Sequence, residues 1–598
     1  MSPNEPWNRY IIYYKMSNEE IEEGSNEEED MDSFVTPEKI VSYIYKDMKE
    51  LIGAIIVSIL IYLKIRNNNN ISQIKKIFLA LLPILLTIFY LKFLKFAPNP
   101  KKGYFLSILY SNKPMETGFK HKSKGTWPFV GSAIIKINDI NYIFVGGGKD
   151  QDDALLYHDK NKDKFINIIK ETGINSKSAT FSAVSFDLDG DGKNDLIVGR
   201  NDGVYLYKQT NNKIFKKIKI QGKLDKIPSA LAVSDYNNDG KPDIYVSYFT
   251  PRKKYRGTVF NDPSHGRYNM LLKNVSGTSF KDVTKKTNAG GRPYNTFTAS
   301  FIDLNNDTYP DLVLSHDSGE IELLENKKGK FISHTPYKPK GNWMGLASGD
   351  IDNDGDQDLF LTNLGTDTRK DNLSIGDLKT GQEQTFKHVL LRNDGKFKFI
   401  EDNKKYNVPE DGFGWGAIFA DINLDSTLDL LFAENTMIYP YHHIFPKPGH
   451  YHELKNNKFE RKFIYNNSHF GQTPLLGDID GDGIKDVIWI NMNGPVIIYK
   501  NKNKSKNNYV IVSLPETVEF ANAEVVLDTY DKKFNRQVIQ GGIGFGSDSS
   551  NDIMFGLGKR NKIKNITVYT NAGKKYVVVE PKINSILKLK HLKKIENK

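Results

Sequence analysis

Short apolar runs separated by polar loops dominate the chain from about residue 125 to residue 505. Val, Ile, Leu, Phe and Tyr fill these runs, as in Ala133–Ile137 and Leu196–Val198, and such residues favour strands over helices. The runs recur in groups of four, and each group predicts a four-stranded antiparallel sheet. Seven such groups predict an all-β fold, a seven-bladed β-propeller over residues 103–505.

Six of the seven groups carry an acidic loop between their first and second strands. Its form is Asp-x-Asp/Asn-x-Asp-Gly/Ser/Thr-x-x-Asp, and it recurs at intervals of 47 to 71 residues. Carboxylates that converge in a tight loop repel one another unless a cation lies among them. Oxygen ligands, including a backbone carbonyl at position 7, are those that Ca²⁺ prefers. The predicted Ca²⁺ ligands at positions 1, 3, 5 and 9 are Asp187, Asp189, Asp191 and Asp195; Asp235, Asn237, Asp239 and Asp243; Asp303, Asn305, Asp307 and Asp311; Asp350, Asp352, Asp354 and Asp358; Asp421, Asn423, Asp425 and Asp429; and Asp478, Asp480, Asp482 and Asp486.

These loops differ from EF-hand loops, which need a Glu at position 12 and a following helix. Position 12 is apolar here, as at Val198 and Trp489, and lies in a β-forming run, so each loop is the turn of a hairpin. The alternative is an Asp/Asn/Gly-rich turn that binds nothing. That alternative weighs most for the loops with Thr308 and Ser426 in place of Gly, because a side chain strains the bend.

The first and last groups of strands are incomplete in different ways. The first, which begins at Ala133, has its strands but no acidic loop. The last has no further β-forming run of its own after Tyr499. An open ring would leave exposed strand edges. We therefore expect the preceding segment Tyr104–Tyr110 to supply the missing outer strand of the last group.

Several segments resemble FG-GAP/VCBS repeat proteins of the integrin-α propeller type. The matching residues are Trp343–Asp358, Gly414–Asp421 and Ser279–Thr284, with Gly541–Ser550 and Phe555–Gly558 near the C-terminus. Within that group the chain is most similar to the cartilage acidic protein family, whose bacterial members add a C-terminal ASPIC/UnbV domain. The resemblance covers roughly residues 125–585 and implies Ca²⁺ and a binding role, without supplying a reaction.

The C-terminal residues 506–590 predict a separate small domain. Their short apolar runs suit a β-sandwich-like domain packed beside the propeller. The glycine run Gly541–Gly546 lacks the strand-to-helix context of a phosphate-binding loop, so it does not indicate a nucleotide site.

The N-terminal residues indicate a membrane anchor. Residues 1–50 include a carboxylate-rich stretch and predict an acidic disordered tail. Residues 51–96 hold two apolar runs, Leu51–Leu63 and Ile77–Leu91, each shorter than the about 20 residues of a spanning helix. Flanking lysines that reach the interface would lengthen the second run. We expect transmembrane helices here, as a helical hairpin or a single span; two soluble core helices are the alternative.

A ligand is expected on the face opposite the acidic loops. The loops between second and third strands emerge there, and the long ones are Phe249–Arg267, Leu364–Lys387 and Glu434–Gly449. Long loops on a rigid scaffold commonly bind partners. The candidates on this insertion face are Arg252, Arg256, Arg267, Trp343, Trp415, His442 and His443. For the arginines, the alternatives are an anion site and a solvated basic loop. For the tryptophans, they are a ligand platform and packing in the core. For the histidines, they are a Zn²⁺ or Cu²⁺ site and residues that merely flank a strand.

Composition and motifs argue against two classes of function, nucleic-acid binding and catalysis. The net charge is +11, but the lysines are scattered and no recognition motif accompanies them, so we expect no nucleic-acid partner. No nucleophile–base or acid pair stands out beyond the loops, so no catalytic residue is predicted. We expect a membrane-anchored, calcium-binding propeller for recognition or adhesion outside the cytoplasm, where calcium is high enough to fill such modules, with a protein or carbohydrate ligand. A glycan-acting surface enzyme and a scaffold for a partner membrane protein are the alternatives.

Overall fold

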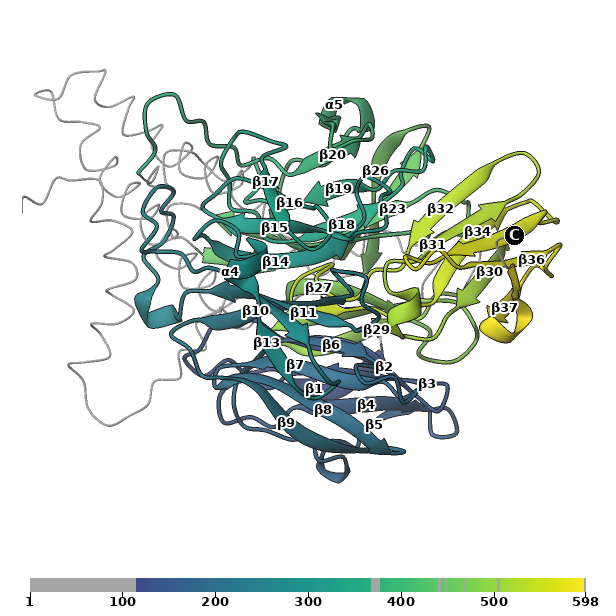
Figure 1. The fold of residues 1–598 in the computed structure, drawn as a ribbon, viewed down its shortest axis with the longest axis horizontal. Coiled ribbons are helices and arrows are strands. Elements are labelled where there is room, and N and C mark those ends of the chain that lie inside the picture. Colours follow the sequence, from purple (N-terminus) through teal and green to yellow (C-terminus); the bar gives the residue numbers. More distant parts are fainter. Residues whose placement is uncertain are drawn as a thin grey trace, which may run out of the picture. The chain divides into compact units, whose positions relative to one another are not determined.

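The computed structural model describes residues 115–366, 377–438, 443–446, 449–465, 469–502 and 506–595, which belong to one compact unit (Figure 1). No helix in these ranges is long and apolar enough to cross a membrane. The predicted acidic tail, membrane anchor and strand Tyr104–Tyr110 all lie outside the described residues.

Seven antiparallel sheets of four main strands each occupy residues 115–499, and each of the first six is built from consecutive strands. In chain order these are β2 (Ser132–Ile137), β3 (Ile140–Val145), β4 (Ala154–Asp159) and β5 (Lys164–Asn167); β6 (Thr180–Phe186), β7 (Asp195–Arg200), β8 (Gly203–Asn211) and β9 (Ile214–Gly222); β10 (Ile227–Ser234), β11 (Asp243–Phe249), β12 (Met270–Asn274) and β13 (Phe280–Asp282); β14 (Asn295–Ile302), β15 (Asp311–Asp317), β16 (Glu322–Asn326) and β17 (Phe331–His334); β18 (Leu346–Gly349), β19 (Asp358–Leu361), β20 (Val389–Asn393) and β21 (Phe399–Glu401); and β22 (Phe413–Ala420), β23 (Asp429–Ile438), β25 (Gly449–Lys455) and β26 (Lys458–Tyr465), with β24 (His443–Pro446) paired to β23. Single helical turns, α4 (Thr284–Thr287) and α5 (Asn403–Tyr406), follow β13 and β21.

The seventh sheet joins the two ends of this region. It contains β27 (Phe470–Gly477), β28 (Asp486–Met492) and β29 (Pro495–Tyr499), and its outer strand is β1 (Met115–Lys120). β1 pairs antiparallel with β29, with Met115 opposite Ile498. A segment that precedes the first sheet therefore completes the last one, as the sequence suggested, although the described strand begins at Met115.

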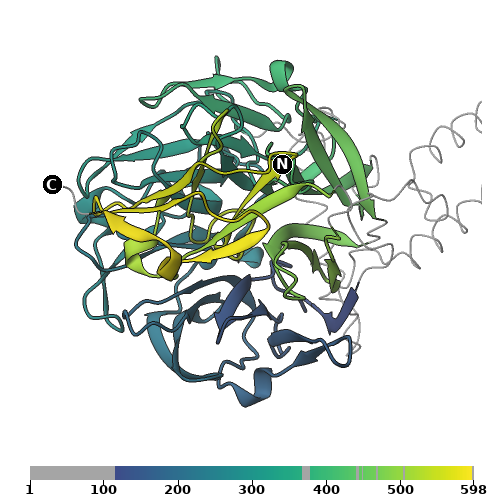
Figure 2. The ribbon, with the colours of Figure 1, turned by 90° about the vertical axis from the view of Figure 1, so that its right-hand side faces the viewer.

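Neighbouring sheets pack face to face through seven separate apolar clusters. In β2, Ala133 and Ile135 pack toward the second sheet, whereas Ile134 packs toward Leu475 of the seventh. Both faces of an inner strand are thus buried, which explains why these strands read as continuous apolar runs rather than alternating ones. Because the seventh sheet packs against the first, the sheets close a ring that is consistent with a β-propeller (Figure 2).

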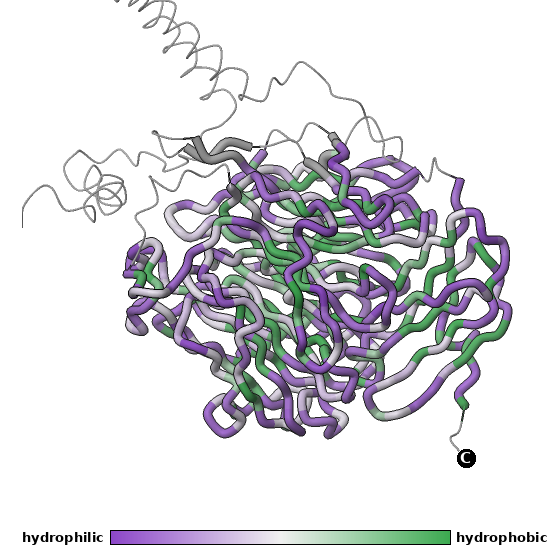
Figure 3. Tube along the Cα trace, turned by 90° about the horizontal axis from the view of Figure 1, so that it is seen from above, coloured by the Kyte–Doolittle hydropathy of each residue, from purple (hydrophilic) through white to green (hydrophobic). Residues whose placement is uncertain are grey.

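Burial falls from the first strand of each sheet to the fourth. Every residue of β6, β10, β14 and β27 is buried, whereas β13 is half-buried to exposed. Figure 3 shows hydrophobic stretches inside the molecule and hydrophilic residues at its outer turns.

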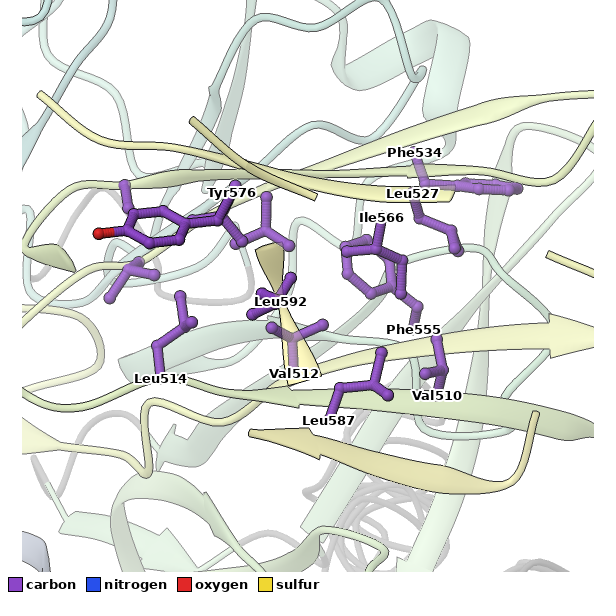
Figure 4. Close-up of a cluster of buried hydrophobic side chains, with 14 of the residues drawn as sticks. Val510, Val512, Leu514, Leu527, Phe534, Phe555, Ile566, Tyr576, Leu587 and Leu592 are labelled. Atoms are coloured by element: carbon purple, nitrogen blue, oxygen red, sulfur yellow. The ribbon is translucent and has the colours of Figure 1, made fainter. Parts of the chain in front are cut away.

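The C-terminal domain consists of two sheets that pack face to face. One contains β30 (Asn508–Ser513), β34 (Ile553–Gly558) and β37 (Ser585–Lys588); the other contains β31 (Glu524–Asp528), β32 (Lys533–Gln537), β35 (Asn565–Tyr569), β36 (Lys575–Val579) and β38 (Lys593–Ile595). Val510, Val512, Leu527, Phe555 and Ile566 are among the buried side chains between them (Figure 4). This two-layer arrangement agrees with the sandwich-like domain expected from the sequence.

The glycine run of this domain enters the ring of sheets. Gly541 bridges to Ala232 of β10, Gly544 bridges to Leu346 of β18, and β33 (Ser547–Asp548) pairs in parallel with β2. A Cβ on Gly542 would lie 1.8 Å from the carbonyl oxygen of Ala299, so only glycine fits there. The sequence did not predict this contact: the two sheets of the domain stay separate from the ring, and its glycine segment reaches the innermost strands of several sheets.

Candidate metal sites

All six acidic loops connect the first and second strands of their sheets, and position 9 is the first residue of the second strand. In each loop the backbone N–H of position 6 donates to the carboxylate of position 1. The Gly192 N–H lies 2.9 Å from Asp187 Oδ2, and the Gly483 N–H lies 3.0 Å from Asp478 Oδ2. The loops therefore share one internal geometry, which sets the first carboxylate in a fixed orientation.

The carboxylate at position 9 is fully buried in all six loops. One of its oxygens accepts the backbone N–H at the end of the third strand, at 2.8 Å from Gln209 to Asp195 and 2.7 Å from Asn326 to Asp311. In five loops its other oxygen accepts the N–H of position 2 of the same loop. The position 9 side chain thus ties the loop to the sheet interior.

Burial makes these carboxylates hard to ionise together. It raises the pKa of Asp195 to about 7 and the pKa of Asp243 and Asp358 to about 8, and neighbouring carboxylates of the same loops add to the shift. A cation among them would favour the charged forms and lower these pKa values again.

The donor atoms fit an oxygen-seeking cation. In three loops, carboxylate oxygens lie within 4.8 Å of one another; the sets are Asp187, Asp189 and Asp195; Asp350, Asp352 and Asp358; and Asp478, Asp480 and Asp486. Within the described structure, buried oxygens of Asp189, Asp352 and Asp478 have no hydrogen-bond partner. Buried, unpartnered carboxylate oxygens are costly unless a cation or a donor satisfies them, and Ca²⁺ takes such ligands.

The loops that depart from the pattern keep the same bend. Thr308 and Ser426 adopt positive φ values of 72° and 81°, in the range of the glycines they replace. Their N–H groups donate to Asp303 at 2.8 Å and to Asp421 at 3.0 Å. A side chain in this conformation costs about 1 kcal/mol per residue, so the predicted strain is present and the loop geometry survives it.

Asparagines at the ends of third strands connect successive loops, a feature that the sequence analysis missed. The Asn326 side chain donates to the carbonyl of Tyr236, position 2 of the preceding loop, at 2.7 Å. Asn274, Asn393 and Asn501 donate in the same way to Leu188, Leu304 and Ile422. The signal was a recurring pattern of two apolar residues, a charged residue and Asn, as in Leu271–Asn274. Leu454 replaces Asn in the sixth sheet, so this link is missing between the loops that begin at Asp350 and Asp421.

The C-terminal domain contacts the acidic loops directly. The Gly556 N–H donates to Asp421 Oδ2 at 2.9 Å, and the Gly558 N–H donates to the Leu424 carbonyl at 2.9 Å. The Asn535 side chain donates to the Gly355 carbonyl at 3.0 Å. The glycines of the Phe555–Gly558 motif are therefore explained by close approach to a loop, as those of the Gly541 run are by close approach to strands.

The residues predicted for the insertion face are mostly engaged within the protein. Trp343 is fully buried and its indole N–H donates to the Gly319 carbonyl at 3.0 Å, so it belongs to the core. Trp415 is half-buried and packs on Phe545 from the glycine run.

The three arginines of that face also have partners. Arg256 pairs with Asp262 at 2.7 Å, Arg252 donates to the Thr126 carbonyl at 3.2 Å, and Arg267 donates to the Asp225 carbonyl at 3.0 Å. His443 lies in β24, and His442 lies outside the described residues.

Comparisons with known proteins agree with the repeat and with the C-terminal domain. Residues 187–246 and 303–361 match the FG-GAP-like repeat, and residues 519–596 match the ASPIC and UnbV domain. The chain therefore contains FG-GAP-like repeats and a C-terminal ASPIC/UnbV domain. It is distantly homologous to cartilage acidic protein 1 of Xenopus tropicalis, at 34% identity over 125 residues, which are 20% of this chain and 19% of that protein.

Solved structures show weaker similarity. An Agrocybe aegerita lectin that recognises non-reducing terminal N-acetylglucosamine is 14% identical, with 62% of this chain and 94% of the lectin covered and a TM-score of 0.38. The Trypanosoma rangeli sialidase is 9% identical, with coverages of 66% and 60% and a TM-score of 0.34.

Proposed function

We propose that the chain is a seven-bladed, calcium-binding β-propeller that serves recognition or adhesion outside the cytoplasm and is anchored to a membrane by residues 51–96. The observation that carries this proposal is the set of buried carboxylate oxygens in the acidic loops that have no partner among the described residues. The membrane anchor and the cellular location rest on the sequence pattern alone.

The chain's own residues would hold the ion through positions 1, 3, 5 and 9, with the backbone carbonyl of position 7. Ca²⁺ would supply the positive charge that the converging carboxylates lack. Position 9 lies at the start of the second strand and is bonded to the end of the third, so binding there ties three strands together. This arrangement favours a structural role for the ions rather than a catalytic one.

A protein or carbohydrate ligand would bind on the opposite face, where the long insertions interlock. The Asp377 carboxylate of the second insertion accepts the backbone N–H groups of Phe260 and Asn261 of the first, at 2.6 and 2.9 Å. Loops fixed to each other in this way present a preorganised surface, which lowers the entropic cost of binding.

Calcium titration of the full-length protein in detergent tests the proposal, with the melting temperature measured with and without chelator. Filling a site at 100 times its Kd adds about 2.7 kcal/mol of stability, so several filled loops should raise the melting temperature strongly. Mg²⁺, which needs smaller octahedral sites, serves as the control and should have a much weaker effect. An absence of binding up to millimolar Ca²⁺ would refute the calcium role.

A further inference from the structure

Arg536 is a buried cation of the C-terminal domain. It lies in β32 and is 9% exposed. One guanidinium nitrogen donates to the Asn535 carbonyl at 2.7 Å, and the group lies 5.5 Å from the centroid of the Phe555 ring. Its Nε has no hydrogen-bond partner among the described residues. A buried guanidinium with an unsatisfied donor requires a compensating negative charge.

The neighbours of Arg536 place it between two acidic loops. Asn535, directly before it, donates to Gly355 in the loop that begins at Asp350. Phe555, beneath its guanidinium, precedes Gly556, which donates to Asp421 of the next loop. The Asp421 carboxylate is buried, and its Oδ1 has no partner in the described residues.

The charges at this junction are complementary. Both neighbouring loops begin with a buried aspartate, Asp350 and Asp421, and Arg536 brings a positive charge to the same junction.

Three lysines that contact other loops lie in more exposed positions than Arg536. Lys208, Lys273 and Lys500 contact Asp189, Asp239 and Asp480 from third strands, and their side chains are between 22% and 33% exposed. A flexible ammonium group at the surface can swing into water when a metal ion enters. Arg536 is covered by its own domain and cannot leave while that domain is docked.

We propose that Arg536 is an internal counter-ion for the loops that begin at Asp350 and Asp421 and that it competes there with Ca²⁺. These two loops, which no asparagine connects to each other, fill last as a result of this competition, and filling them weakens the docking of the C-terminal domain. The inference rests on the proposed function, because it requires the loops to bind calcium.

The test is calcium titration of full-length wild type, Arg536→Met and Lys533→Met in detergent by calorimetry. Arg536→Met removes the buried charge and keeps most of the volume. Lys533→Met removes the same charge from an exposed position of the same strand. Removing a buried unit charge beside a divalent site should tighten the weakest sites by at least about tenfold. The Lys533 variant should match wild type.

A second measurement uses wild type alone and does not depend on how the variant folds. Crystals grown at limiting Ca²⁺ should show anomalous density in the loops that begin at Asp187 and Asp478 before the loops that begin at Asp350 and Asp421. Unchanged or weaker Ca²⁺ affinity in Arg536→Met, or early filling of the Asp421 loop, overturns this inference and leaves the proposed function untouched. No calcium binding by any of the three proteins overturns the proposed function and, with it, the inference.

Discussion

The loops that begin at Asp187 and Asp421 share one internal design but lie in different surroundings. In both, the position 6 N–H donates to the first carboxylate and the position 9 carboxylate is held by the end of the third strand. Lys208, a partly exposed side chain of the same sheet, contacts Asp189 of the first loop. The C-terminal domain contacts both loops, but differently. Glu516 accepts the backbone N–H of Asp187 and the side chain of Asn194 in the first loop, whereas Gly556 donates to the Asp421 carboxylate itself in the second. The same motif therefore meets the C-terminal domain through its backbone in one place and through its first carboxylate in another.

The largest expected effect is a dependence of stability on pH that the calcium-free protein shows and the calcium-loaded protein does not. Asp195, Asp243 and Asp358 have raised pKa values of about 7 to 8 in the folded state, against about 4 when unfolded. The folded protein then binds more protons between these values, so its stability falls as pH rises from about 4 to about 8. Melting in chelator across this range should show that decline. In Ca²⁺ the ionised forms are favoured, and a decline of equal size there would contradict the ion sites.

Substitution of matched glycines sharpens the comparison between the two loops. A Cβ on Gly556 would lie 2.3 Å from Asp421 Oδ2, whereas a Cβ on Gly190 in the Asp187 loop meets nothing within 4 Å. Gly556→Ala should destabilise the docked C-terminal domain by about 2–4 kcal/mol. Gly190→Ala should cost only about 1 kcal/mol, from its positive φ.

Hydrogen exchange of the domain sheets and the global melting temperature provide the readout for these glycine variants. Faster exchange in β31 and β32 is expected for Gly556→Ala alone. Equal effects of the two substitutions would show that the contact between Gly556 and Asp421 does not hold the domain.

The smallest expected effect concerns the asparagine links between loops. Asn326→Ala removes side-chain hydrogen bonds to the Tyr236 and Pro310 carbonyls, which should cost about 1–3 kcal/mol. Chemical denaturation measures this loss. The reverse substitution, Leu454→Asn, probes the one junction that lacks the link. If Asn326→Ala is as stable as wild type, the asparagine links do not contribute to the free energy of unfolding.

Much of the architecture could be predicted because short local patterns specify it. An inner strand packed on both faces needs a continuous apolar run, and a tight acidic turn needs glycine and closely spaced aspartates. The sequence from Phe181 to Val198 therefore predicts β6, β7 and the loop between them. The Asn at the end of the third strand in four sheets also recurs locally. The partner of its side chain lies in another sheet, so the local pattern did not show what it binds.

The sequence by itself thus determined the repeated sheets, the acidic loops and the two-sheet C-terminal domain, since short-range periodicity and turn chemistry specify each of them. Only the tertiary structure decided that Trp343 is core, that the glycine run meets the inner strands, and that Gly556 meets the Asp421 loop. The contacts of the C-terminal domain join residues more than one hundred positions apart, as with Gly556 and Asp421. Burial and charge at such places depend on which surfaces the fold brings together, and no local pattern encodes that.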